Sequence, residues 1–340
     1  MNLTFEQIKS ITTGAVSVEQ QGDGVHFYRF TPEQAPLRQP KVSLFAQKIT
    51  SSAGVRLCFH TDSETLYLRT AVTTGSACKF FSFDLLVNGV YTDSLENFSH
   101  LETIDTVNGA TCEFGTFEKT FSLGSGTKDI DLFFPWSVTP VLEALSLEDG
   151  SSLTPNIPSK KLLVYGDSIS HGYNTLYSSK HYVSQLALAL GAQVFNKGIG
   201  GTTTFPEMAL ARESFDPDYV LVAYGSNDWD RHDADFFTQQ YRTMLQTVTN
   251  NYPHAQVFII TPVWRGDQEK RERKMGPLSV VEQHIRTIAA DYPDITIISG
   301  MDLVPHDSRY FADVTLHPGD SGYAHHFSNL WPQIKAALKG

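Results

Sequence analysis

The sequence predicts two domains, an all-β sandwich of jelly-roll type over residues 1–155 and an α/β domain with a parallel sheet over residues 156–340. The first half contains short β-rich runs separated by Gly, Ser, Asn and Asp. The second half alternates apolar strands with amphipathic helices. Between them, residues 148–152 and the prolines Pro155 and Pro158 mark the change of pattern.

The N-terminal half, from about Val16 to Leu147, contains the predicted strands of the sandwich. Short strands at this spacing, with no convincing helix between them, are typical of an antiparallel jelly roll. The dipeptide Asn88-Gly89 lies between two of these strands and predicts a two-residue hairpin. The predicted strands include residues 25–30, 55–60, 65–70, 80–87, 116–123 and 130–134.

Beyond the boundary, strands and helices alternate. This βαβ pattern predicts a parallel sheet with helices on both faces, in which ligands bind at the carboxyl ends of the strands. We therefore expect the chemistry just after each strand. The predicted strands are 162–165, 192–195, 219–224, 257–261 and 295–299, and the predicted helices are 182–190, 234–249, 280–290 and 322–338.

Composition and charge narrow the range of partners. The 340 residues are 41% hydrophobic and 19% charged, and their net charge is -11. Nucleic acid and anionic lipid are held mainly by clustered Lys and Arg, so we expect neither as a partner and instead a neutral or weakly charged substrate. Residues 1–20 contain no continuous apolar run, so neither a secretory signal nor a membrane span is visible and a cytoplasmic location is expected.

The cysteines Cys58, Cys78 and Cys112 are odd in number and all lie in the first third of the chain. They form no CxxC pair and have no histidine spacing suited to zinc. We expect buried free thiols. A disulfide between two of them would matter only in an exported protein.

The first strand of the predicted parallel sheet ends in Gly166-Asp167-Ser168, which places a serine on the turn before the next helix. Its hydroxyl cannot attack an ester unaided. The chemistry requires a base within hydrogen-bond reach and donors aimed at the oxygen that becomes negative. The backbone N–H of Ser168, at a helix start, is one such donor.

Three other segments can supply the remaining parts. Gly201 follows the second strand, where a glycine lets the backbone approach a substrate, and Asn227 follows the third strand with an amide side chain. His317 lies in the loop before the last helix and is the predicted base. Each segment alone is explained as well by a turn, a helix cap or a loop. Their order, and the position of each at a strand end or its equivalent, favour catalysis.

These four segments resemble blocks I, II, III and V of the SGNH, or GDSL, hydrolase superfamily. The resemblance covers residues 160–340 and implies a flavodoxin-like three-layer α/β/α domain. It also implies a Ser168 and His317 pair assisted by an aspartate, and an oxyanion hole formed by the N–H groups of Ser168 and Gly201 with the Asn227 side chain. The N-terminal half resembles, in architecture only, the β-sandwich that precedes this domain in some carbohydrate acetyl esterases and related acyltransferases.

The sequence departs from the family pattern beside the histidine. The family usually has Asp three residues before it, whereas this chain has Val314 there and Asp313 one residue earlier. A turn of the loop could absorb the shift, so that Asp313 orients the ring of His317 through its Nδ1–H. A backbone carbonyl or Asp302 is the alternative.

Asp167, His171 and Trp264 follow strands and are candidate pocket residues. For Asp167, the favoured role is to support its own turn. His171 and Trp264 could either line the wall of the pocket or only pack against neighbouring residues. His325 and His326 are adjacent and cannot both face one metal ion from a helix, so a helix surface is expected for them. A basic cluster follows the strand at 257–261 at the edge of the site and could attract an anionic substrate, but a solvated basic loop is expected for its members, Arg265, Lys270, Arg271, Arg273 and Lys274.

We therefore expect a serine esterase that works through an acyl-enzyme, without metal or organic cofactor, on a small acyl ester, most simply an acetyl ester of a carbohydrate. An acyltransferase using the same serine is the alternative among enzymes. A glycan-binding protein with an inactive hydrolase domain is the alternative from another class. The sandwich could bind carbohydrate, support the catalytic domain or form a contact in a homo-oligomer.

Overall fold

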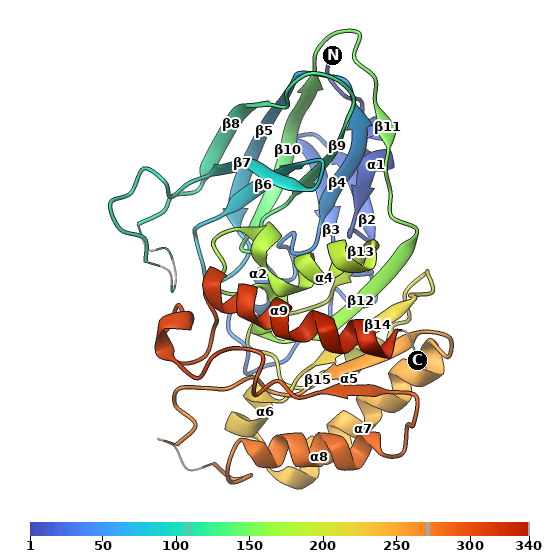
Figure 1. Cartoon of the computed structure of the whole chain (residues 1–340), viewed down its shortest axis with the longest axis vertical. Coiled ribbons are helices and arrows are strands. Elements are labelled where there is room, and N and C mark those ends of the chain that lie inside the picture. The colour runs from blue at the N-terminus through green and yellow to red at the C-terminus, as the bar shows by residue number, and fades with distance from the viewer. Residues whose placement is uncertain (106, 108, 110, 270–272, 339–340) are drawn as a thin grey trace.

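A computed structural model describes residues 1–105, 107, 109, 111–269 and 273–338. The β-rich N-terminal domain lies at one end of the long axis, and the C-terminal domain, a parallel sheet flanked by helices, lies at the other (Figure 1). This confirms the predicted fold class.

The N-terminal domain consists of two sheets whose strands pair antiparallel. Apolar side chains of both sheets form one core, which includes Leu57 and Phe83 from one sheet and Leu68 and Leu142 from the other. The first sheet has the order β1 Thr12–Thr13, β4 Arg56–Thr61, β9 Lys128–Phe133, β6 Ser82–Val87 and β7 Val90–Glu96, with β11 Thr154–Pro155 paired to β4. The second has the order β2 Ser17–Gln21, β3 Gly24–Tyr28, β10 Val138–Leu147, β5 Thr65–Thr74 and β8 Gly115–Ser122.

The hairpin predicted at Asn88-Gly89 is confirmed. It joins β6 to β7, and the two residues have φ of 51° and 76°, as the short turn requires. The expectation of no helix between residues 16 and 147 is wrong, because α2 (Phe45–Lys48) lies there. A further helix, α1 (Phe5–Ile11), precedes that range and begins with a capping box of Thr4 and Gln7 that the sequence does display.

The C-terminal sheet has the strand order β13-β12-β14-β15-β16, all parallel, which is the flavodoxin-like order. Each predicted strand and helix is found within a few residues of its expected bounds. The strands are β12 Lys160–Gly166, β13 Ala192–Asn196, β14 Tyr219–Ala223, β15 Gln256–Ile260 and β16 Thr296–Ile298. The α-helices are α3 Ser168–His171, α4 Tyr182–Leu190, α5 Pro206–Leu210, α6 Ser226–Arg231, α7 Ala234–Asn251, α8 Ser279–Ala289 and α9 Asp320–Ala337.

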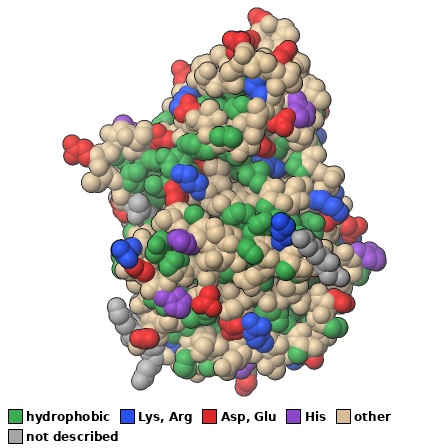
Figure 2. Space-filling view, in the orientation of Figure 1, with side chains coloured by type: hydrophobic (Ala, Val, Ile, Leu, Met, Phe, Trp, Pro, Cys, Tyr) green, Lys and Arg blue, Asp and Glu red, His purple; other side chains and the backbone are tan. Residues whose placement is uncertain are grey.

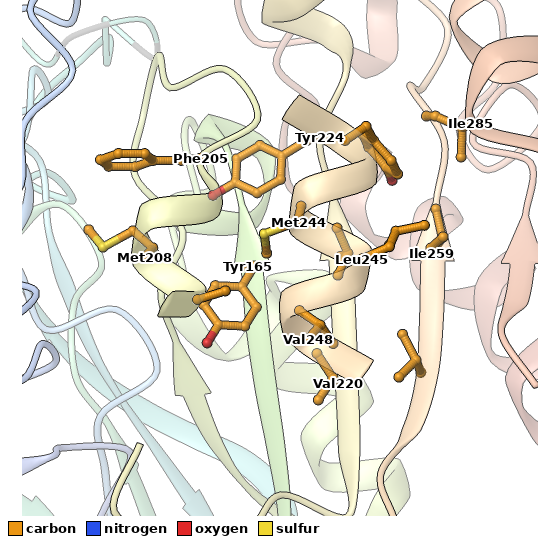
Figure 3. Packing of buried hydrophobic residues seen from close by; sticks show 14 of the residues in the cluster. Tyr165, Phe205, Met208, Val220, Tyr224, Met244, Leu245, Val248, Ile259 and Ile285 are labelled. Atoms are coloured by element: carbon orange, nitrogen blue, oxygen red, sulfur yellow. The ribbon is translucent and has the colours of Figure 1, made fainter. Parts of the chain in front are cut away.

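Helices cover both faces of this sheet. Side chains along β12 alternate between them, since Tyr165 packs with α5, α7 and α8 while Val164 packs with α4 and α9. Figure 3 shows the first of these cores, where Met244 and Val248 of α7 lie against the strand that carries Val220. Because the apolar layers hold the strands in register, the residues after each strand meet at one edge.

The three cysteines are buried and unpaired, as expected. Within the described ranges, no helix has the length and apolar character that crossing a membrane would need. On the face shown in Figure 2, acidic and basic side chains are interspersed and do not form one large patch of a single sign.

A buried arginine joins the two domains. Arg29 follows β3 and is 1% exposed, and its guanidinium donates to the carbonyls of Lys48 and Ser51 in its own domain. It also donates to the carbonyls of Asn196, at 2.6 Å, and Gly198, at 3.3 Å, in the loop after β13. Its hydrogen bonds thus connect the N-terminal domain to the loop after β13, at the carboxyl edge of the parallel sheet.

Arg29→Met is expected to lower the free energy of unfolding by about 3–5 kcal/mol, because removing the guanidinium leaves several buried carbonyl oxygens without a donor. Urea denaturation measures this change. As a control, Arg242→Met removes an exposed arginine paired with Asp291 and should change the stability by less than about 1 kcal/mol. Equal effects of the two substitutions would show that Arg29 does not join the domains energetically.

Candidate active site

Ser168 lies at the start of α3, directly after β12. The preceding residue caps this short helix, since the Asp167 carboxylate accepts from the N–H of Ile169 at 3.0 Å. The Ser168 residue is 5% exposed, so its hydroxyl is at the sheet edge yet largely removed from bulk water. Burial raises the pKa of Asp167 to about 6, against the opposing effects of its hydrogen bond and of His317.

The imidazole of His317 meets this hydroxyl across 149 residues of sequence. Its Nε2 lies 2.8 Å from the Oγ of Ser168. The His317 loop runs from η2 (Ser308–Tyr310) to α9, and an isolated bridge between Phe311 and Pro318 closes it at its base. The base and the hydroxyl are therefore within direct hydrogen-bond reach.

Asp313 lies on the far side of the imidazole. Its Oδ2 is 2.7 Å from the Nδ1 of His317, and its Oδ1 accepts from the backbone N–H groups of Thr315, Leu316 and His317. Val314 has a φ of 70°, a left-handed conformation that is rare for a β-branched residue. This turn absorbs the one-residue shift from the family pattern.

Of the three candidates for orienting His317, the structure places Asp313 against the ring. Asp302 is 91% exposed and lies 4.0 Å from His306 instead. Burial would raise the pKa of Asp313, but its hydrogen bond to His317, the imidazolium charge and the backbone donors outweigh burial and lower the pKa well below the usual range. Asp313 is therefore ionised wherever the imidazole acts as a base.

Gly201 and Asn227 lie together beside the serine edge of the sheet. Gly201 follows β13 with a φ of 84°, which glycine adopts without strain. The Asn227 side chain, at the start of α6, donates through Nδ2 to the carbonyl of Thr202 at 2.9 Å and keeps a second N–H. Within the described part of the chain, the backbone N–H groups of Ser168 and Gly201 donate to no acceptor.

The loop of residues 198–201, here called the oxyanion loop, is held by cations that the sequence analysis did not single out. Lys48 of α2 is 5% exposed, and its Nζ donates to the carbonyl of Gly200 at 2.8 Å. Arg231, at the end of α6, donates to the carbonyl of Gly201 at 2.5 Å. Burial, helped by the charge of Arg231, lowers the pKa of Lys48 to about 8. Neither cation belongs to a motif, so only the folded chain reveals them.

Tyr173 forms the wall between the oxyanion loop and the base. Its ring lies 5.4 Å from the ring of His317, and a Cβ added at Gly200 would lie 2.3 Å from it. A side chain at position 200 is therefore excluded. Tyr173 also packs on Trp136 of the N-terminal domain, with ring centroids 4.9 Å apart.

The other predicted pocket residues have different surroundings. His171 is fully buried between the domains, where its Nδ1 accepts from the N–H of Gly200 and its Nε2 contacts the Ser51 hydroxyl at 2.7 Å. Burial lowers its pKa well below the usual value, so it stays neutral and has a packing role. Trp264 is half-buried and stacks on His306, with centroids 5.3 Å apart.

The prediction that both histidines of the pair lie on the helix surface is wrong for His326. His326 is 1% exposed and packs on Tyr182, because this side of α9 faces α4, while His325 is exposed. Among the described residues, no group of His, Cys, Asp and Glu side chains is arranged to hold a metal ion.

The prediction of a solvated basic loop is wrong for Arg265 and Arg273, which are paired with carboxylates. Arg265 is 5% exposed, forms a two-point contact with Asp267 and donates to the carbonyl of Ser226. Arg273 forms an ion pair with Asp230. Lys274 is exposed as expected, and Lys270 and Arg271 lie outside the described residues.

Comparison with known proteins relates this geometry to a family and to solved structures. Residues 164–325 match the model of the GDSL-like lipase/acylhydrolase family. The chain is similar to the salicylyl-acyltransferase SsfX3 from a tetracycline biosynthetic pathway, with a TM-score of 0.76, 19% identity and coverage of 96% of this chain and 94% of that chain. A sequence comparison with curated proteins finds no match.

Two further structures share the fold over both domains. One is described as a GDSL-like lipase from Bacteroides ovatus, with a TM-score of 0.75, 17% identity and coverage of 100% of this chain and 98% of that chain. The other is the acetyl xylan esterase Est2A from Butyrivibrio proteoclasticus, with a TM-score of 0.62, 13% identity and coverage of 100% and 98%. At these identities the likeness concerns the fold.

Proposed function

We propose that the chain is a member of the SGNH, or GDSL-type, hydrolase superfamily, since residues 164–325 match the GDSL-like family model, and that it is a serine esterase that removes small acyl groups, acetyl first among them, from a carbohydrate. The observation that carries the proposal is the 2.8 Å contact between the Ser168 hydroxyl and the His317 imidazole, with the Asp313 carboxylate bonded to the other ring nitrogen. A base placed beside a hydroxyl and oriented by a carboxylate activates that hydroxyl for acyl transfer.

In the first step, Nε2 of His317 takes the proton of the Ser168 hydroxyl as Oγ forms a bond to the ester carbonyl carbon. The carbonyl π electrons move to oxygen, and the resulting oxyanion accepts from the N–H groups of Ser168 and Gly201 and from the side chain of Asn227. When the intermediate collapses, the bond to the alcohol oxygen breaks. That oxygen takes the proton from Nε2, which leaves an acyl-enzyme.

In the second step, water replaces the alcohol. His317 removes a proton from the water as its oxygen attacks the acyl carbon. The second tetrahedral intermediate expels Oγ, which recovers its proton from Nε2, and the free carboxylic acid leaves. Asp313 holds the ring in one tautomer and stabilises the imidazolium in both steps.

Support for a sugar ester comes from the architecture. The chain shares its fold with an acetyl xylan esterase over both domains. Similarity to a salicylyl-acyltransferase supports a second candidate, in which an alcohol replaces water in the second step. The glycan-binding alternative, which requires an inactive hydrolase domain, receives no support from the contact between Ser168 and His317.

The test is acetate release from a panel of acetylated sugars, together with hydrolysis of p-nitrophenyl esters of increasing chain length. The proposal predicts turnover of acetyl esters that falls as the acyl chain lengthens. Adding sugar acceptors distinguishes the two candidates, because a transferase forms a new ester at the expense of free acid. No release of acid from any ester would exclude the esterase.

Asn227→Ala is expected to lower kcat by roughly 100- to 1,000-fold with little change in KM. The substitution removes one donor whose hydrogen bond strengthens as negative charge develops on the carbonyl oxygen of the ester. Initial rates on p-nitrophenyl acetate measure the change. A suitable control is Asn329→Ala, which removes an amide donor to carbonyls near residue 302, away from the serine. A variant at position 227 with full kcat would exclude this side chain from the oxyanion hole.

A further inference from the structure

A cleft of about 590 Å³ opens next to the oxyanion loop, and the proposed mechanism does not use it. One wall is formed by residues 37–41 of the N-terminal domain. The opposite walls are formed by residues 203–207, which follow the oxyanion loop, and by residues of α6 and α7 between positions 231 and 240. Its volume is typical of sites for small molecules. We call it the basic cleft.

Two lining residues, Thr203 and Arg231, connect the basic cleft to the oxyanion loop. Thr203 lies two residues after Gly201, and its N–H donates to the side chain of Gln39 across the domain boundary at 3.1 Å. Arg231 lines the cleft and also bonds to the carbonyl of Gly201, while Asn227 lies one helical turn earlier in α6. A molecule that contacts Arg231 in the cleft is therefore separated from Gly201 by that side chain alone.

The charge of the cleft is opposite to that of the protein. Arg38, Lys41 and Arg231 line it, and Glu207 is the one carboxylate among its described lining residues, although the chain carries a net charge of -11. Behind Arg231, the ammonium group of Lys48 adds a further positive charge at the oxyanion loop. Low-dielectric walls concentrate such a field within a cleft.

Two of these cations, Arg38 and Lys41, are available to a ligand. Within the described ranges, neither Arg38 nor Lys41 forms an ion pair with a carboxylate. Arg38 donates through one nitrogen to the carbonyls of Ala35 and Leu37, and its guanidinium lies 5.5 Å from the ring centre of Phe45. This leaves its remaining N–H groups in a fixed fork, the geometry that binds a carboxylate.

We propose that the alcohol part of the ester carries a carboxylate, as in a sugar acid, which binds in the basic cleft while the ester carbonyl enters the oxyanion hole. The inference rests on the proposed esterase function and deepens it by naming the substrate class. It narrows the sequence-based expectation of a neutral or weakly charged substrate to a singly charged one, because the three cations converge only in the folded chain.

The test compares two substrates that differ in one group, a mono-acetylated methyl glucuronoside and the matching acetylated methyl glucoside. The wild type is expected to have the lower KM for the glucuronoside, and this KM should rise with added NaCl while that of the glucoside stays constant. The double variant Arg38→Gln/Lys41→Gln should raise KM for the glucuronoside by about three- to tenfold, with kcat and the glucoside kinetics unchanged.

Lys9→Gln is the matched control, since it removes an exposed lysine of α1, which packs on β4 and β11 of the N-terminal domain. Equal KM values for the two substrates, or equal effects of the double variant on both, would overturn the inference while leaving the esterase intact. If no ester is hydrolysed in a Ser168-dependent way, the esterase itself fails. Calorimetric titration with unacetylated methyl glucuronoside then tests the cleft separately, because the double variant should bind it more weakly than the wild type.

Discussion

Ser168→Ala is expected to lower kcat for ester hydrolysis by roughly 10⁴- to 10⁶-fold, because no other group in this geometry can form the acyl-enzyme. The hydroxyl is 2.8 Å from the base, whereas an alanine leaves the imidazole without a nucleophile to activate. Initial rates on p-nitrophenyl acetate, with mass spectrometry after treatment with a fluorophosphonate, measure activity and labelling together. Both should disappear.

The matched control is Ser170→Ala, two residues along the same helix. Ser170 is fully buried and its hydroxyl bonds to the Tyr182 hydroxyl at 2.8 Å, so this change costs packing and one hydrogen bond but should leave kcat within about tenfold of the wild type. Thermal unfolding of both variants shows whether they fold. A folded Ser168→Ala protein that retains activity would disprove the proposed nucleophile.

Much of the fold and site could be predicted because their determinants are local. The strand β14 is an apolar run followed by Gly225, and the next residues place Asn227 at the sheet edge. The same holds for Ser168 after β12. Since parallel strands bring their carboxyl ends to one edge, short segments that are distant in sequence could be assigned to a common site without knowledge of their packing.

What the sequence analysis missed depends on contacts between the domains. Lys48 belongs to a short helix with no side-chain cap, and Arg29 follows an ordinary strand, yet both bond to carbonyls of the loop that includes Gly198 and Gly200. No periodicity marks such residues, because their role depends on where another domain packs. The basic cleft was missed for the same reason, whereas Arg265, from the predicted basic loop, proved to be paired with Asp267.

Asp313→Asn is expected to lower kcat by roughly 10³- to 10⁴-fold while the fold is preserved. The amide oxygen can still accept from the backbone N–H groups that now bond to Oδ1, so the turn at Val314 remains. However, an amide N–H directed at Nδ1 favours the tautomer that carries its proton on Nε2. That tautomer cannot accept the proton of Ser168.

The same substitution also changes how the free energy of unfolding depends on pH. The folded-state pKa of Asp313 lies below its unfolded value of 3.8, so the ionised carboxylate stabilises the wild type above that value and this stabilisation is lost as the pH falls through the lower, folded pKa. The amide that replaces the carboxylate in the variant does not titrate. Urea unfolding should therefore show a larger loss of stability in the wild type than in Asp313→Asn as the pH falls below about 4.

Asp302→Asn separates this effect from a general loss of acidic charge. Asp302 is 91% exposed and was the alternative partner of His317, so its replacement should leave kcat and the acid-induced unfolding unchanged. If Asp302→Asn instead reduced kcat and Asp313→Asn did not, the imidazole would be oriented by a different carboxylate in solution. The left-handed turn at Val314 would then have no catalytic reason, since its effect is to bring Asp313 to the position that the family pattern assigns to the following residue.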